Sequence, residues 1–186
     1  MDEDKVKNIV FYILEQAENQ EIPIGKTRLI KLLYLLDLEN YRLRQMILTG
    51  LNWIFYKFGP YTFEIEGFFN KIGIKKEEIY INEVKRFSRL EKEFEEEDIK
   101  LDIETKTIIK NLIEEWGTAD LNKLLDYIYF DTEPMIKAQT RGEKLDFSSI
   151  LPAEFYSIKQ YKVSKKQGEK IIKKIKDWES SRKGDY

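Results

Sequence analysis

The start of the chain carries apolar residues at the spacing of an α-helix. Positions i, i+3, i+4, i+7, i+8 and i+11 are filled by Val6, Ile9, Val10, Ile13, Leu14 and Ala17. This spacing gathers the side chains on one helical face. It predicts a first amphipathic helix that ends before Pro23, because a proline disfavours helical geometry in the residue that precedes it.

The next apolar segment has no polar face. Residues 28–38 read RLIKLLYLLDL, so apolar side chains would surround nearly the whole circumference of a helix with Thr27 as a candidate N-cap. The pattern predicts a buried, central helix. Lys31 and Asp37 lie on it, and a buried charge must reach solvent, pair, or lie under a partner. Pairing inside the molecule or at its rim is the favoured interpretation.

Aromatic and β-branched residues dominate residues 51–61, which read LNWIFYKFGPY. This composition predicts a short extended stretch that ends in a turn at Gly59 and Pro60. Two interpretations stay open for the aromatic side chains. They form either a core hairpin under the central helix, which is favoured for Trp53 and Phe55, or a binding platform.

The middle of the chain mixes element types. A third helix is predicted for residues 63–72, ended by Gly73, and a strand for residues 78–84. The run EKEFEEED at residues 91–98 is almost wholly acidic, which predicts a solvated connector.

Helical spacing returns after this run. Asp102 is placed as the N-cap of a helix that ends at Gly117, where glycine favours a left-handed C-terminal geometry. A further helix is predicted from Thr118 or Asp120 to about Phe130. Residues 131–150 are predicted to be loop.

The end of the chain has its own helix signal. Ser164 and Gln167 form a capping box, and the apolar side chains that follow share one face: Ile171, Ile172, Ile175 and Trp178. Taken together, the patterns predict a mainly α protein. It comprises one compact helical domain over residues 1–150, with a small β-hairpin or sheet element, and a basic helical extension over residues 151–186 that packs on the domain or trails it.

The composition of the chain excludes several kinds of catalytic and metal-binding site. The chain has neither cysteine nor histidine, which excludes disulfides, thiolate chemistry, catalytic triads and histidine-bound metals. The N-terminus lacks the features of a signal peptide, and no apolar run is long enough to span a bilayer. We therefore expect a cytoplasmic protein with no membrane contact.

Carboxylates are the remaining candidates for catalysis or metal binding. Several lie in or near residues 126–146: Asp126, Asp131, Glu133, Glu143 and Asp146. They match no calcium loop, phosphate loop or nuclease motif, so surface and capping roles are favoured. The sequence predicts no catalytic residue, no cofactor and no metal site, and hence no enzyme.

Three blocks of the sequence resemble the Panacea domain, the SocA-like family of bacterial and phage antitoxins and proteolysis adaptors. The first is LIKLLYL at residues 29–35, which is similar to the family's Lys-Leu-Leu-Tyr helix. The second is WIFYKFGPY at residues 53–61, which keeps the family's Gly-Pro pair. The third is LLDYIY at residues 124–129, followed by Pro134 and Met135. Together the blocks span about residues 5–134, within the predicted domain.

The chain departs from the family pattern at several positions. Tyr56 lies where the family pattern has a tryptophan, Phe58 where it has a tyrosine and Tyr61 where it has a valine. Tyr129 and Met135 lie where the family often has a histidine and a tryptophan. These departures mark a divergent member. The resemblance implies a mostly helical domain that neutralises a partner toxin by binding it, or presents a partner to a protease.

The leading hypothesis is therefore an antitoxin-like regulator whose partner is a protein, either a cognate toxin or a protease substrate; a homodimer stays open. Rigid aromatic side chains beside a turn are typical of interface hot spots. The predicted partner-binding residues are Lys31, Tyr34, Phe58, Gly59, Pro60 and Tyr61.

The alternative is a DNA-associated regulator of phage or mobile-element origin. It would use the basic C-terminal helix, because residues 159–183 carry ten Lys or Arg against three Asp or Glu. Nucleic acid is the less favoured partner, since the net charge is −2 and a lysine-rich face is usually only solvated.

Overall fold

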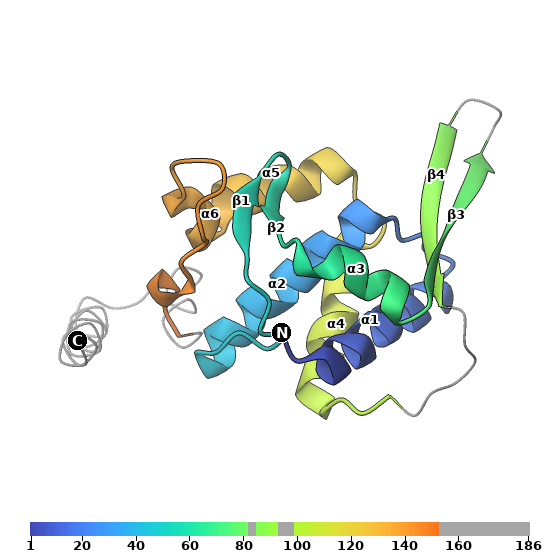
Figure 1. Cartoon of the computed structure of the whole chain (residues 1–186), viewed down its shortest axis with the longest axis horizontal. Helices are drawn as coiled ribbons and strands as arrows, with labels where there is room; N and C mark the ends of the chain where they lie inside the picture. Colours follow the sequence, from blue (N-terminus) through green and yellow to red (C-terminus); the bar gives the residue numbers. More distant parts are fainter. Residues whose placement is uncertain (82–84, 93–98, 153–186) are drawn as a thin grey trace, which may run out of the picture.

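The computed structural model describes residues 1–81, 85–92 and 99–152. The predicted C-terminal helix and nearly all of the extension over residues 151–186 lie outside the described residues. Within the described residues the protein is mainly helical with small antiparallel β elements, as predicted (Figure 1). The elements are α1 (Glu3–Glu18), α2 (Lys26–Arg44), β1 (Ile54–Tyr56), β2 (Gly59–Tyr61), α3 (Glu64–Lys71), β3 (Ile74–Ile81), β4 (Lys85–Lys92), α4 (Ile103–Trp116), α5 (Leu121–Asp131), α6 (Glu133–Lys137) and a 3₁₀ turn (Phe147–Ser149).

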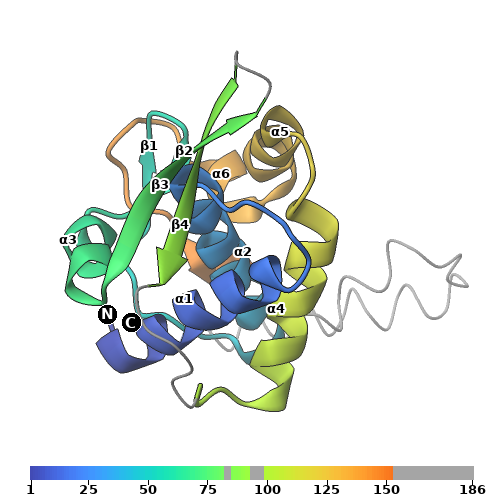
Figure 2. The ribbon, with the colours of Figure 1, turned by 90° about the vertical axis from the view of Figure 1, so that its right-hand side faces the viewer.

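Helix α2 is the centre of the fold, as its continuous apolar circumference predicts. Every residue from Leu29 to Leu38 is buried, including both charged ones. Figures 1 and 2 show α1 and α4 along one side of α2, and the β1–β2 hairpin with α5 and α6 along the other. The core therefore wraps around one helix.

Side-chain caps hold three of the other helices. Asp2, Asp102 and Asp120 accept hydrogen bonds from backbone N–H groups in the first turns of α1, α4 and α5, which satisfies donors that a helix leaves free at its start. The prediction of Thr27 as the N-cap of α2 is wrong. Gly25 holds that position, and no side chain caps it.

Gly117 ends α4 as predicted, but its backbone is right-handed, with φ at −60°. The expected left-handed geometry is therefore wrong. Its lack of a side chain matters for space instead, because an added Cβ would press on the carbonyl oxygen of Ile113 and the side chain of Ile22.

The β1–β2 hairpin replaces the predicted Gly59–Pro60 turn. Ile54 pairs with Tyr61 and Tyr56 pairs with Gly59, so the chain reverses at residues 57–58 and Gly59 and Pro60 begin the second strand. The backbone of Gly59 has φ at +85°, a region that glycine enters without strain. The aromatic segment is thus a hairpin against α2, and its tip carries Phe58.

Two elements were missed by sequence patterns. Strand β4 pairs with β3 over its whole length and takes in the first residues of the predicted acidic connector; charged residues dominate β4 and hide its alternation. Helix α6 lies in the predicted loop, with Pro134 in its first turn, where proline fits a helix start. No helix in the described part of the chain has the length and apolar character needed to cross a membrane.

Candidate functional site

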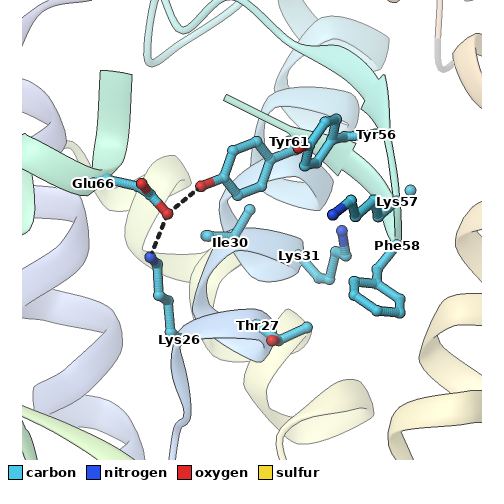
Figure 3. A pocket seen from close by; sticks show the side chains of 10 residues that line it. Lys26, Thr27, Ile30, Lys31, Tyr56, Lys57, Phe58, Tyr61 and Glu66 are labelled. Carbon is cyan, nitrogen blue, oxygen red and sulfur yellow. Dashed lines mark hydrogen bonds and ion pairs between the residues drawn. The ribbon is translucent and has the colours of Figure 1, made fainter. Parts of the chain in front are cut away.

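A pocket of about 240 Å³ opens between the first turns of α2 and the β1–β2 hairpin (Figure 3). Four lining residues follow one face of α2, at i, i+1, i+4 and i+5, five come from the hairpin, and one comes from α3. They are Lys26, Thr27, Ile30, Lys31, Tyr56, Lys57, Phe58, Gly59, Tyr61 and Glu66. The pocket therefore brings together four of the six residues predicted to bind a partner.

Lys31 is the buried charge of this pocket. Lys31 is only 2% exposed, and its Nζ donates a hydrogen bond to the carbonyl oxygen of Pro60 at 2.7 Å. Burial lowers the pKa of Lys31 to about 7, since desolvation penalises the ammonium form. Lys31 therefore has an internal hydrogen-bond partner, but among the described residues no carboxylate pairs with it.

Asp37, the second buried charge on α2, lies away from the pocket. Its carboxylate accepts hydrogen bonds from the backbone N–H of Thr49 at 2.9 Å, from the Thr49 hydroxyl group, and from Nε1 of Trp53 at 2.7 Å. Burial nevertheless raises its pKa to about 6. Asp37 therefore ties the chain after α2 to the core, and Trp53 is a core residue, as favoured.

Tyr34 does not line the pocket. Its side chain is fully buried, the hydroxyl group lies 3.0 Å from Oγ1 of Thr132, and the ring meets Trp53 and Phe147 edge to face. Because this helix position faces the core, Tyr34 is a packing residue in this structure. Pro60 is also buried, and it contributes its carbonyl group to Lys31.

Phe58 and Tyr61 give the pocket its aromatic rim. Phe58 is 66% exposed at the hairpin tip. Tyr61 is half-buried, and its hydroxyl group donates to Glu66, which also pairs with Lys26 at 2.6 Å. Burial and the hydrogen bond to Glu66 raise the pKa of Tyr61 above its ordinary value.

Sequence reasoning missed six pocket residues. Thr27 lies four residues before Lys31, and Lys26 lies four residues before Ile30, so helical spacing could have indicated the α2 contribution. Glu66 carries no such signal, since it lies 40 residues beyond Lys26 and reaches the pocket only through the placement of α3.

The acidic residues near the end of the domain serve other roles. Glu133 forms an ion pair with Arg42 at 3.0 Å, and Glu143 accepts hydrogen bonds from the backbone N–H groups of Gln139 and Thr140. In the described ranges no three His, Cys, Asp or Glu side chains are grouped as a metal site. The basic C-terminal segment lies outside those ranges.

Comparison with known proteins gives one match. Neither a curated protein nor a solved structure matches the chain. The family model for the antitoxin SocA-like Panacea domain matches residues 29–133, which begin in α2, include the β1–β2 hairpin and end at the start of α6. Because this match covers more than half of the 186 residues, the chain belongs to the SocA-like antitoxin family that is defined by the Panacea domain.

Proposed function

We propose that this protein neutralises a toxin protein by binding it directly, and that the contact surface is the hairpin tip with the adjoining pocket. Family membership supports an antitoxin-like regulatory role. The observation that carries the choice of surface is Phe58, a large apolar side chain that stands 66% exposed beside a pocket. Aromatic anchors next to concave sites are typical of interface hot spots.

The hairpin is suited to this role because the backbone of β1 is held on both edges. One edge of β1 pairs with β2, and on the other edge the N–H of Phe55 donates to Glu143, the N–H of Gly142 to Phe55, and the N–H of Leu145 to Trp53, at 2.7–2.9 Å. A fixed backbone loses little entropy on binding. Phe58 is therefore presented in a defined position.

Co-expression tests the proposal. The protein is produced together with the product of the neighbouring gene, in a host whose growth that product arrests. Neutralisation by binding predicts that growth recovers and that the two proteins co-purify as a complex. Recovery without a complex, together with a protease-dependent loss of the toxin, would instead indicate presentation for proteolysis. No recovery and no complex would refute the proposal for that pair.

Binding to DNA is the second candidate function, favoured by the ten Lys or Arg in residues 159–183. Each phosphate contact would make the affinity fall with salt. Strong retention of the full chain on duplex DNA, lost on removing residues 159–186, would favour this function.

A further inference from the structure

We propose that the pocket between α2 and the β1–β2 hairpin binds a carboxylate carried beside an apolar group, that Lys31 pairs with it, and that an acidic side chain of the partner toxin supplies it. The identity of the supplier rests on the proposed function. The carboxylate site itself is argued from the pocket alone.

The charges of the pocket are unbalanced. Its lining contains three lysines and one glutamate. Glu66 already pairs with Lys26 and accepts the hydrogen bond from Tyr61. Neither Lys31 nor Lys57 pairs with a carboxylate among the described residues. The pocket therefore has an excess of positive charge that a bound anion would neutralise.

Lys31 is the deepest of these charges and has capacity to spare. An ammonium group has three N–H donors, and among the described residues Lys31 uses one of them, on the carbonyl oxygen of Pro60. A buried charge without a counter-charge is costly. A carboxylate that enters the pocket would supply both the opposite charge and hydrogen-bond acceptors, at a site already shielded from water.

The lining and the volume of the pocket indicate which kind of group carries the carboxylate. Ile30, Tyr56, Phe58 and Tyr61 give the lining a large apolar share. The volume of about 240 Å³ is below the range of roughly 300–1,000 Å³ of small-molecule and cofactor sites. One acidic side chain with an apolar neighbour fits this space better than a nucleotide. A dianionic phosphate group would also be repelled more strongly by Glu66 than a carboxylate would be.

The ionisation of Lys31 provides a second signature. Its pKa of about 7 in the free protein would rise when a carboxylate pairs with it. Other ionisable groups face the same pocket: Lys26 from α2, Tyr56 and Lys57 from the hairpin, Tyr61 from β2 and Glu66 from α3. Among these groups, the pKa of Tyr61 is raised and the pKa of Glu66 is lowered, so both move away from neutrality. Binding should therefore take up a proton above pH 7, and affinity should fall as pH rises.

A small probe tests the site without the partner. We expect 3-phenylpropionate to shift the backbone NMR signals of residues 26–31 and 56–61 in a saturable way, and the uncharged 3-phenylpropionamide to bind at least about tenfold more weakly, as expected for losing a hydrogen-bonded charge. Lys31→Met should abolish the preference for the acid. Lys110→Met, at an exposed position of α4, should keep it. Equal binding of acid and amide by the natural chain would overturn the carboxylate site, even if Lys31→Met fails to fold.

A second experiment tests whether the toxin supplies the carboxylate. With the toxin from the co-expression experiment, Lys31→Met should weaken binding at least about tenfold, and 3-phenylpropionate should compete. Normal toxin binding by a folded Lys31→Met variant would refute the claim that an acidic side chain of the toxin pairs with Lys31. The proposed function would still stand. Binding of the probe without any toxin binding would refute both the proposed function and the supplier, and leave the carboxylate site standing.

Discussion

Lys31 and Asp37 carry opposite charges on one buried helix, yet each is stabilised separately. Six residues apart, they face different sides of α2, since residues three or four apart share a helical face. Asp37 receives hydrogen bonds from Thr49 and Trp53. The ammonium group of Lys31 donates one hydrogen bond, to the carbonyl oxygen of Pro60. The carboxylate is therefore satisfied within the fold, while the ammonium group keeps a capacity that a ligand can use.

The pKa of Lys31 predicts how stability depends on pH. The folded value of about 7 lies below the ordinary 10.5, so between these values the unfolded chain binds more protons and stability rises with pH. From about pH 7 to 9, the natural chain should gain about 2 kcal/mol relative to Lys31→Met. Urea denaturation at both pH values measures this difference. Lys110→Met should show no such change; a pH-independent difference for Lys31→Met would mean that Lys31 stays charged in the fold.

Trp53→Phe removes one donor from Asp37. We expect a loss of about 1–3 kcal/mol in the free energy of unfolding near neutral pH, because the hydrogen bond to the carboxylate is lost. Burial places the folded pKa of Asp37 at about 6, above its ordinary value, so below pH 6 the group is protonated and the loss should shrink. Denaturation between about pH 5 and 8 tests this. Trp116→Phe, whose ring stacks on Tyr127, is the control and should show a loss without this pH trend.

At the scale of elements, α2 stabilises the fold through its buried circumference. Leu33 is fully buried, so Leu33→Ala should cost roughly 2–5 kcal/mol through lost burial and the cavity left behind. Leu43→Ala, on the same helix but 46% exposed, should cost much less. Chemical denaturation of the two variants gives the comparison, and similar losses would contradict the central position of α2.

The β1–β2 hairpin depends on one backbone geometry. Gly59→Ala places a side chain at φ +85°, which should cost about 1–2 kcal/mol through steric strain. Gly67→Ala is the matched control. Gly67 lies within α3 with open space around it, so alanine should stabilise by about 0.5–1 kcal/mol. Thermal unfolding should show midpoints that move in opposite directions; an unchanged or raised midpoint for Gly59→Ala would disprove the assignment of strain to Gly59.

At the scale of the molecule, the two sides of α2 have different tasks. Helices α1 and α4 cover one side and complete the core, while the hairpin side carries the pocket and its aromatic rim. We therefore expect the exposed residues of the proposed contact surface to contribute little to folding. This separation would allow binding to be altered without loss of the fold.

Phe58→Ala tests this separation. The side chain is 66% exposed, so the unfolding midpoint should stay nearly unchanged, as for most surface substitutions. Toxin binding should weaken by about 2 kcal/mol or more, the hot-spot threshold. Phe130→Ala, 73% exposed on α5 and outside the pocket lining, should change neither property. Calorimetric titration with the toxin measures the effect, and unchanged binding for Phe58→Ala would place the contact elsewhere.

The sequence by itself determined the five longer helices and the centre of the fold. Apolar patterns together with capping residues located α1, α2, α3, α4 and α5, because the position of a side chain on a helix follows directly from its spacing. The unbroken apolar circumference of α2 marked it as buried. Residue patterns failed where the pairing of neighbouring strands decided the structure: β4 depends on pairing with β3, and Gly59 and Pro60 form a strand, not a turn, because they pair with β1.

The candidate site divides in the same way. Lys31, Phe58 and Tyr61 stood out in the sequence as a charge on a buried helix and as aromatic residues beside a glycine. Only the tertiary structure decided that Tyr34 belongs to the core and that Lys26 and Glu66 meet at the pocket rim. The physical reason is range: burial and charge pairing between residues far apart in sequence depend on how helices pack, and the spacing of residues along one helix does not contain that information.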